Sequence, residues 1–441
     1  MNFSLAAVSN GMIMDRLRSN DAPVFSEAQQ IKEILESVVQ LPGLLAQSPD
    51  GQPEPEALRK LISNLSSLIA PIRRLPLELL EIIFVNAIGI ADLALHSGTH
   101  RRVPAVCHHW RSVALSTPEF WSTFAVSLEA QGGTVLPTLR LHIARSRQRL
   151  LRIHILYDNP LFLSKEINGE ALAELLKHTE QWGHISIPHG LDVSHFALTR
   201  GRLLSLQSFA YEGKWLQAPL ALQAFMMAPN LYTVDLALSN LDDYTDTRME
   251  NIVPCQGHLT RLTLHHFQRW NASLGHFIQQ FCGSLCQLIL HDIKIRTRDL
   301  LAALRILPAL ESLSIGRMSA LAVNDVLFDA IESEKIVPLL KEFYLGGRNL
   351  GSTGSILSML ESRDRRSRLS KICLVFEMRA VWPTQRSRLK SLGFLDWSKY
   401  FRRVAGGFAR IDGGQARWQN REFDNEYFPP LPPSCRVFIE I

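Results

Sequence analysis

The chain contains no group of residues with the spacing of a common catalytic site. It lacks a G-x-x-x-x-G-K-[ST] phosphate loop, a G-x-S-x-G nucleophile turn and an H-E-x-x-H zinc motif. The pairs His108–His109 and His265–His266 are adjacent, and neighbouring side chains diverge by about 100° on a helix and point to opposite faces of a strand. Such pairs rarely share a metal ion. The sequence therefore predicts a protein that is not an enzyme and has no metal site and no cofactor.

The spacing of the cysteines also argues against a metal site. Cys282 and Cys286 lie four residues apart with His276 nearby, but Cys286 follows Leu285, which opens a predicted strand. We therefore expect buried thiols rather than metal ligands. No C-x-x-C pair occurs among the six cysteines, which favours reduced thiols in an intracellular protein. The acidic run at residues 242–246 lacks the other ligands of a calcium loop.

Composition limits the class of protein. Of 441 residues, 46% are hydrophobic and 20% are charged, as in globular rather than disordered chains. The net charge of +5 is spread along the chain, which does not predict a nucleic-acid partner. The arginine cluster within residues 363–368 is predicted to be a solvated loop. Neither a basic signal-peptide start nor a run of about 20 apolar residues is present. We expect a cytoplasmic and/or nuclear protein that does not bind a membrane.

The first third of the chain has helical periodicity. Apolar residues recur at helical spacing over residues 24–40 and again from Glu56 to Ile69, where Pro71 stops the pattern. A linker rich in proline and acidic residues separates these two stretches at 47–56. Further apolar helices are predicted at 75–84 and 106–114, and a third apolar segment starts at 117–121.

These segments carry a family resemblance. Residues 75–84 read L-P-x-E-L-L-x-x-I-F, residues 106–114 read V-C-x-x-W-R-x-V-A, and P-E-F-W follows at 118–121. The combination resembles the F-box of fungal (mushroom-type) F-box proteins, although Pro104 departs from the usual start of the second helix. The resemblance implies docking to the Skp-type adaptor of a cullin–RING ubiquitin ligase.

More apolar residues occur in this module than three short helices can bury, so part of them is predicted to meet the adaptor. The sequence leaves open whether Leu80 and Trp110 pack internally instead. The candidate adaptor-binding residues are Leu75, Pro76, Leu79, Leu80, Ile83, Phe84, Val106, Cys107 and Trp110.

A repeat follows the module. The pattern L-x-x-φ-x-φ, where φ is apolar, starts at residues 206, 231, 259, 285, 310, 340 and 369, with a weaker copy at Trp182. The steps of 24 to 30 residues suit leucine-rich repeats. Predicted short helices lie between the patterns at 273–281, 297–307, 324–333 and 355–361, so each unit is expected to be one strand plus one helix.

The expected fold is an α+β repeat protein. An N-terminal helical F-box module precedes an α/β leucine-rich-repeat-like solenoid. The predicted parts are an N-terminal segment and linker (1–55), a helix plus F-box module (56–130), the solenoid (138–380) and a C-terminal cap or tail (381–441). A closing strand is predicted at 437–439.

Strand residues between the apolar positions should face outward and bind another protein. The candidate target-binding residues are Asp235, Arg261, Thr263, His265, Gln287, Ile289, His291, Ser314, Glu342 and Tyr344. The sequence thus predicts a substrate-recognition adaptor of an SCF-type ubiquitin ligase, whose partners are the Skp-type adaptor and a target protein. The alternative is a non-catalytic leucine-rich-repeat scaffold that does not recruit a ligase.

Overall fold

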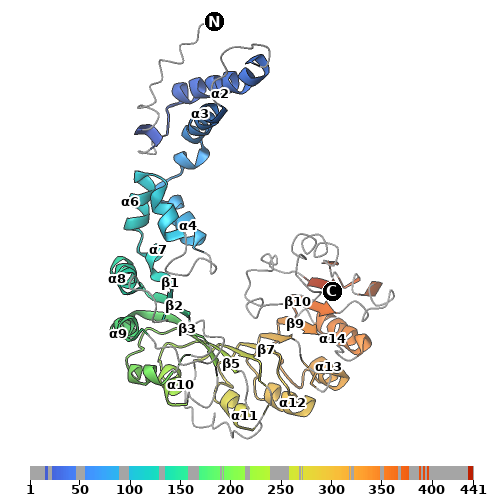
Figure 1. Cartoon of the computed structure of the whole chain (residues 1–441). Coiled ribbons are helices and arrows are strands. Elements are labelled where there is room, and N and C mark those ends of the chain that lie inside the picture. Colours follow the sequence, from blue (N-terminus) through green and yellow to red (C-terminus); the bar gives the residue numbers. More distant parts are fainter. Residues whose placement is uncertain are drawn as a thin grey trace. The chain divides into compact units, whose positions relative to one another are not determined.

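A computed structural model of the chain shows an α/β protein that divides into two compact units (Figure 1). Unit 1 comprises Met1–Leu156 with Glu166–Glu174, and unit 2 comprises Tyr157–Lys165 with Leu175–Ile441. No helix in the part of the chain that is described is both long and apolar enough to cross a membrane. The structure describes residues 15–17, 22–45, 55–88, 99–128, 135–156, 168–188, 191, 193–213, 219–238, 258–267, 270, 272–316, 318, 322–347, 352–365, 369–376, 387–388, 391–392, 395–396 and 436–440.

Unit 1 begins with a pair of packed helices, α2 (Phe25–Leu45) and α3 (Pro55–Leu68). Both were predicted from helical periodicity, and both are confirmed. The buried side chains of Leu65 and Leu68 on α3 pack against half-buried residues of α2 such as Ile31. The helix α3 stops just before Pro71, which opens the short 3-10 helix η2 (Pro71–Arg74), because proline lacks the N–H that would continue the ladder.

Four more helices of unit 1 follow from local signals. The longest two are α4 (Leu77–Ala87), which starts directly after Pro76, and α6 (His108–Ser116). The sulfur of Cys107 accepts a hydrogen bond from the backbone N–H of Trp110 at 3.4 Å and so caps α6. The helix α5 (Thr99–Arg102) and the 3-10 helix η4 (Val103–Ala105) precede α6, and α7 (Pro118–Ser122) follows with proline in its first turn.

Two strands and a helix complete unit 1, and the repeat analysis did not predict these strands. They are β1 (Thr123–Ser127) and β2 (Leu151–Leu156), which pair in parallel on either side of α8 (Val135–Ser146) in the sequence. The helix α9 (Gly169–Lys177) follows and begins within unit 1. The salt bridge from Arg140 of α8 to Glu174 of α9 measures 3.3 Å.

Unit 2 contains a parallel sheet whose first eight strands follow one another in sequence order. The strand β12 then lies between β10 and β11. The strands are β3 (Trp182–Ile187), β4 (Ser208–Gly213), β5 (Thr233–Leu238), β6 (Arg261–His265), β7 (Gln287–His291), β8 (Ser312–Gly316), β9 (Glu342–Gly347), β10 (Lys371–Phe376), β11 (Leu395–Asp396) and β12 (Arg436–Glu440).

Each apolar pattern in the sequence becomes one of the strands β3 to β10, and the ladder aligns equivalent positions. Ile185 pairs with Phe209, and the same row continues through Val234 and Leu262 to Ile372 on β10. All the side chains in this row that we name here are buried. Because successive side chains alternate between faces, one face of the sheet forms the core. The predicted closing strand is also confirmed, as β12.

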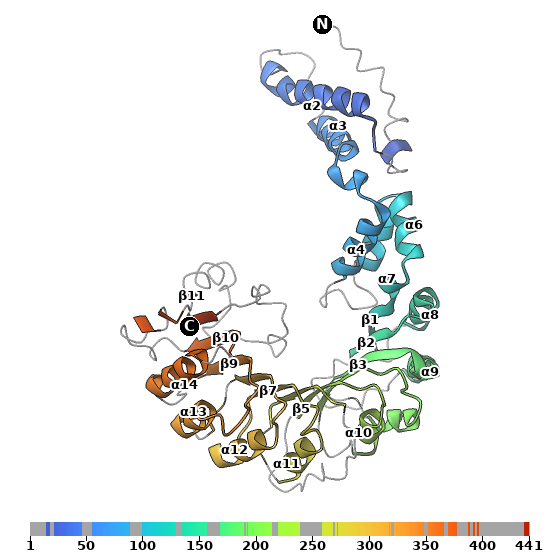
Figure 2. The same ribbon diagram turned by 180° about the vertical axis from the view of Figure 1, so that it is seen from behind.

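Helices cover the core face of the sheet, as the views from two sides show (Figures 1 and 2). They are α10 (Pro219–Met226), α11 (Ala272–Gln279), α12 (Thr297–Arg305), α13 (Asp325–Glu332) and α14 (Thr353–Arg365). The 3-10 helices η5 (Thr179–Gln181) and η6 (Val193–Thr199) lie before and after β3 in the sequence, and η6 packs against α10. The side chain of Asn324 accepts from the Leu327 N–H and caps α13.

One arginine of the cluster that the sequence placed in a solvated loop is fully buried, which corrects that expectation. The residue is Arg363, on α14. Its guanidinium Nη2 donates to the carbonyl oxygen of Ile331 at 2.6 Å and reaches those of Ile336 and Val337 at 3.4 Å, while Nε and Nη1 donate to the carbonyls of Ile331 and Val337. These carbonyls belong to the end of α13 and the turn after it, where cations are favoured. The turn holds Val337 at φ 42°, a costly conformation for a β-branched residue.

We therefore expect Arg363→Met to lower the free energy of unfolding by about 2–4 kcal/mol, because several buried carbonyls lose their donor. Chemical denaturation followed by circular dichroism measures this. The control is Arg305→Met in the last turn of α12, where the side chain is exposed and the change should stay within about 0.5 kcal/mol. Equal effects of the two substitutions would contradict the assigned role of Arg363.

Candidate functional site

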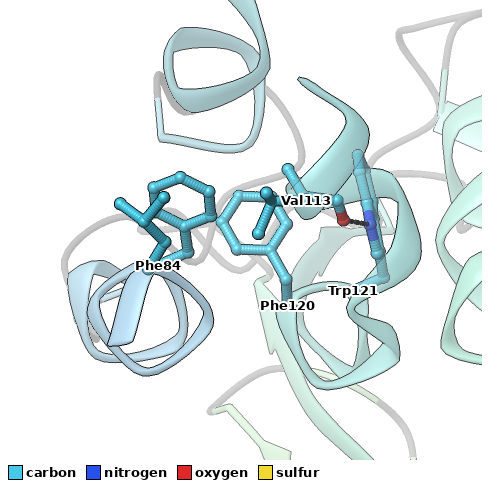
Figure 3. Close-up of a cluster of buried hydrophobic side chains, with 6 residues drawn as sticks. Phe84, Val113, Phe120 and Trp121 are labelled. Atoms are coloured by element: carbon cyan, nitrogen blue, oxygen red, sulfur yellow. Dashed lines mark hydrogen bonds between the residues drawn. The ribbon is translucent and has the colours of Figure 1, made fainter. Parts of the chain in front are cut away.

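The helix α4 buries one stripe of its surface inside unit 1. Leu80 and Phe84 lie in a core cluster with Val113, Phe120 and Trp121 (Figure 3). Leu80 and Phe84 are four residues apart and therefore share one side of the helix. The side that faces α6 and α7 is in this way committed to internal packing.

Aromatic contacts fix the geometry of that cluster. The ring centroids of Phe84 and Trp110 are 4.9 Å apart, and those of Phe84 and Phe120 are 6.3 Å apart with the rings edge to face. The indole N–H of Trp121 donates to the carbonyl oxygen of Ala114 at 2.7 Å, the hydrogen bond drawn in Figure 3. These contacts satisfy the buried polar atom of Trp121 and set the spacing between α4, α6 and α7.

A second side of α4, next to the buried stripe, exposes apolar side chains. Leu79, Ile82 and Ile83 expose 45%, 56% and 40% of their surface. They lie three and four residues apart, so their side chains are neighbours on the helix. We call these three residues the α4 apolar face. Leu77 at the start of α4 and Val106 before α6 are also exposed. Isolated exposed leucines are common, but a grouped set of this kind indicates a binding surface.

The nine candidate adaptor-binding residues fall into three groups. Leu80, Phe84 and Cys107 are buried inside the unit, so they can support a partner only indirectly. Leu75 and Trp110 are half-buried against the core cluster. The remaining four residues are exposed: Pro76, Leu79, Ile83 and Val106. The open question about Leu80 is thereby settled in favour of internal packing.

Sequence reasoning missed two exposed apolar residues of α4, Leu77 and Ile82. Both occupy variable positions of the motif. The signal that identifies Ile82 is its spacing of three residues from Leu79, which places both on one side of a helix.

The second candidate surface is the face of the unit 2 sheet opposite its described helices. The ladder brings five predicted target-binding residues into one row, one from each strand from β5 to β9. A flanking row places Arg261 beside Gln287, and on the other side His265 lies beside His291. We call these residues the sheet face. Its central row is Asp235, Thr263, Ile289, Ser314 and Tyr344.

Three residues of the sheet face are less accessible than predicted. Thr263, Ile289 and His291 expose only 5%, 8% and 6% of their surface. Strands in a sheet lie about 4.8 Å apart, so side chains in a central strand are shielded by their neighbours on the two adjacent strands. The alternation rule predicted the direction of these side chains, and it did not account for this shielding. The accessible part of the sheet face comprises Asp235, Arg261, His265, Gln287, Ser314, Glu342 and Tyr344.

Polar contacts cluster where β6 and β7 end. The Nε2 atom of His265 lies 3.3 Å from a carboxylate oxygen of Asp235, and Nδ1 of His266 lies 2.9 Å from one of Asp292. His266 and Asp292 adopt φ values of 59° and 52°. This left-handed backbone turns the chain directly after each strand and brings both side chains together. His266 and Asp292 were not predicted as surface residues of this kind.

A second polar group lies towards β10. The Nζ atom of Lys371 lies 5.4 Å from the centre of the Tyr344 ring, and Ser312 Oγ donates to Glu342 at 3.1 Å. Burial raises the pKa of Tyr344 above its ordinary value, so the phenol is neutral at pH 7. Burial opposes the charge on Lys371, but contacts with Tyr344 and Glu342 outweigh it and raise the pKa of Lys371. This group offers hydrogen bonds and one cation to a partner.

No cluster suited to a metal ion occurs among the residues that the structure describes. The expectation of buried thiols is wrong for Cys282, which is exposed in the turn after α11, and Cys286 is half-buried. The acidic run 242–246 lies outside the described residues. No family model matches the chain, and no curated protein matches it.

The backbone of β8 leaves room for the ring of His291. A Cβ atom added at Gly316, the ladder partner of His291, would lie 2.6 Å from the ring carbon Cδ2. We expect Gly316→Ala to lower the free energy of unfolding by about 1–3 kcal/mol through overpacking. In a His291→Ala background the same change should cost far less, because the clashing ring is gone.

Chemical denaturation of the four proteins of this double-mutant cycle measures the coupling. The control is Gly275→Ala within α11, where an added Cβ meets nothing within 4 Å, and where alanine should stabilise the helix by about 0.5–1 kcal/mol. Strictly additive effects of the changes at 291 and 316 would contradict the proposed contact.

Proposed function

We propose that this chain is a non-catalytic substrate receptor of an SCF-type cullin–RING ubiquitin ligase. In this proposal the helical module of unit 1 is an F-box that docks the Skp-type adaptor, and unit 2 is a leucine-rich-repeat-like solenoid that holds a target protein. The observation that carries the proposal is the α4 apolar face, which lies within the motif-bearing helix and is exposed in the free chain.

The energetics of the α4 apolar face support a protein partner. Full burial of a Leu or Ile side chain contributes about 1.5–3 kcal/mol. The three residues of the face are about half exposed, so covering them contributes roughly 1 kcal/mol each. Leu77 and Val106 add further apolar surface, and a small number of residues supplies most of the binding energy in many protein interfaces.

The regular sheet of unit 2 supports the solenoid proposal. Each of the strands β3 to β10 is parallel to the next and follows it in the sequence, with α or 3-10 helices in most of the connections. A stack of strand–helix units that contact their neighbours is the arrangement expected of repeat proteins. Such a stack presents one uncovered sheet face, and a mixed polar and apolar surface suits a protein or peptide ligand.

In this proposal the mechanism is positional. One unit binds the ligase core and the other binds the target, which raises the effective concentration of target lysines near the charged ubiquitin carrier. No residue of the chain performs a chemical step, and no cofactor is needed.

Adaptor docking is tested with the full chain and a purified fungal Skp-type adaptor. We expect Leu79→Glu combined with Ile83→Glu to raise the dissociation constant at least 100-fold, because two charges would be buried without partners. Isothermal titration calorimetry measures this. Leu80→Asp does not test adaptor docking, because Leu80 is buried and its substitution would destabilise the fold of unit 1.

The matched control for adaptor docking is Leu141→Glu on α8. Leu141 exposes 44% of its surface, close to the 45% of Leu79, but it lies outside α4. This variant should bind as tightly as the unchanged chain. If the unchanged chain does not bind the adaptor at all, the scaffold alternative without ligase recruitment replaces the proposal.

Target binding is tested by affinity purification and mass spectrometry with three proteins. The face variant combines Arg261→Glu, Gln287→Lys and Glu342→Arg. The control variant combines Arg298→Glu, Arg305→Glu and Asp329→Arg, which are exposed on the helices of unit 2. We expect the face variant alone to lose its targets while all three proteins retain the adaptor. An unchanged set of captured proteins would argue against the sheet face.

A further inference from the structure

Two histidines are packed against each other inside unit 1. His100 of α5 and His142 of α8 expose 7% and 3% of their surface, and their ring centroids are 4.7 Å apart. The Nε2 atom of His100 lies 2.9 Å from the carbonyl oxygen of Phe120, so this nitrogen carries the proton and donates. Buried histidine pairs in contact are costly to ionise, because each charge repels the other and neither reaches water.

Aromatic rings surround the pair. The ring centroid of His142 lies 5.1 Å from that of Trp121 and 5.6 Å from that of Phe124. The ring of His100 contacts Phe120 at 5.0 Å, and Phe120 in turn contacts Phe84 of α4. A continuous series of ring contacts therefore links His142 on α8 to the core cluster that seats α4.

The charged groups near the pair do not compensate a positive charge. On α8 the guanidinium of Arg145 lies 4.3 Å from the centre of the Trp121 ring, and Arg140 pairs with Glu174. On α7 the carboxylate of Glu119 pairs with Arg149 at 2.6 Å.

Among the residues that the structure describes, the other elements packed against the pair add no carboxylate. Arg102 on α5 is exposed. The strands β1 and β2 present apolar residues such as Phe124 and Ile153 to this side, while Arg152 and His154 point to the other face of β2. Burial lowers the pKa of His142 to about 3, and repulsion from His100 and Arg145 adds to this.

We infer that the His100–His142 pair makes the packing of α4–α7 against α8 and β1 sensitive to acid. In an opened state the ring of His142 reaches water and titrates near pH 6.5, whereas in the closed state its burial beside His100 keeps it neutral. The open state therefore binds more protons below about pH 6.5. By linkage, the stability of the closed state is complete above that pH and falls as the pH drops towards 3. The inference concerns the core of unit 1 and does not depend on what α4 binds.

Hydrogen–deuterium exchange of the full chain tests this, with exchange times rescaled for the intrinsic pH dependence. Between pH 6 and pH 4.5, the opening constant of peptides covering 77–87, 108–127 and 135–146 should rise at least about tenfold per pH unit, as uptake of one proton requires. Peptides covering 325–345 in unit 2, a stretch without histidine, serve as the internal reference. His142→Phe should reduce the slope by about one proton, while His108→Gln, a change at an exposed histidine of α6, should leave it unchanged.

A second measurement covers the case in which His142→Phe does not fold. Ring resonances of labelled histidine in the unchanged chain should show His142 remaining neutral between pH 7.5 and 5. Titration of His142 together with the exposed histidines would overturn the inference. So would an unchanged slope in a folded His142→Phe protein.

Discussion

The structure of unit 1 depends on one packing constraint: α4 can turn only one of its apolar sides inward. Phe84 and Leu80 commit that side to α6 and α7, where the ring of Phe84 lies between those of Trp110 and Phe120. The other side, with Leu79, Ile82 and Ile83, is then left in water. A helix that is apolar on two sides gains stability only when a second body covers the rest. The internal core and the proposed docking surface are thus two consequences of one sequence segment.

In unit 2, successive strand–helix segments bury one another's apolar sides. A strand and a helix cannot bury their apolar sides alone, and eight consecutive strands share one core through a row that runs from Ile185 to Ile372. The residues between the core positions are carried to the other face in a fixed register, so polar side chains from distant parts of the sequence become neighbours. His265 and Asp235 meet in this way although they lie thirty residues apart.

The sequence was most informative where periodicity repeats. The eight apolar patterns predicted strands β3 to β10, and helical spacing predicted α3, α4 and α6, because these patterns reflect contacts close in the sequence. The strands β1 and β2 were not predicted, although Leu150, Ile153 and Ile155 have the spacing of the repeat pattern at β2. The burial of Arg363 depends on carbonyls about thirty residues away in the chain, and the shielding of Thr263 depends on neighbouring strands. The pairing of His100 with His142 likewise joins segments that no local pattern connects.

The central claim is that α4 presents an uncovered apolar face in the free chain and that an adaptor covers it. Hydroxyl-radical footprinting of the full chain, alone and with a fungal Skp-type adaptor, tests both parts at once. The account predicts strong labelling of Leu79, Ile82 and Ile83 in the free chain, weak labelling of Leu80 and Phe84, and protection of the first three when the adaptor is added. Leu141 should be labelled equally in both states. Weak labelling of Leu79, Ile82 and Ile83 in the free chain, or labelling that the adaptor leaves unchanged, would contradict the account.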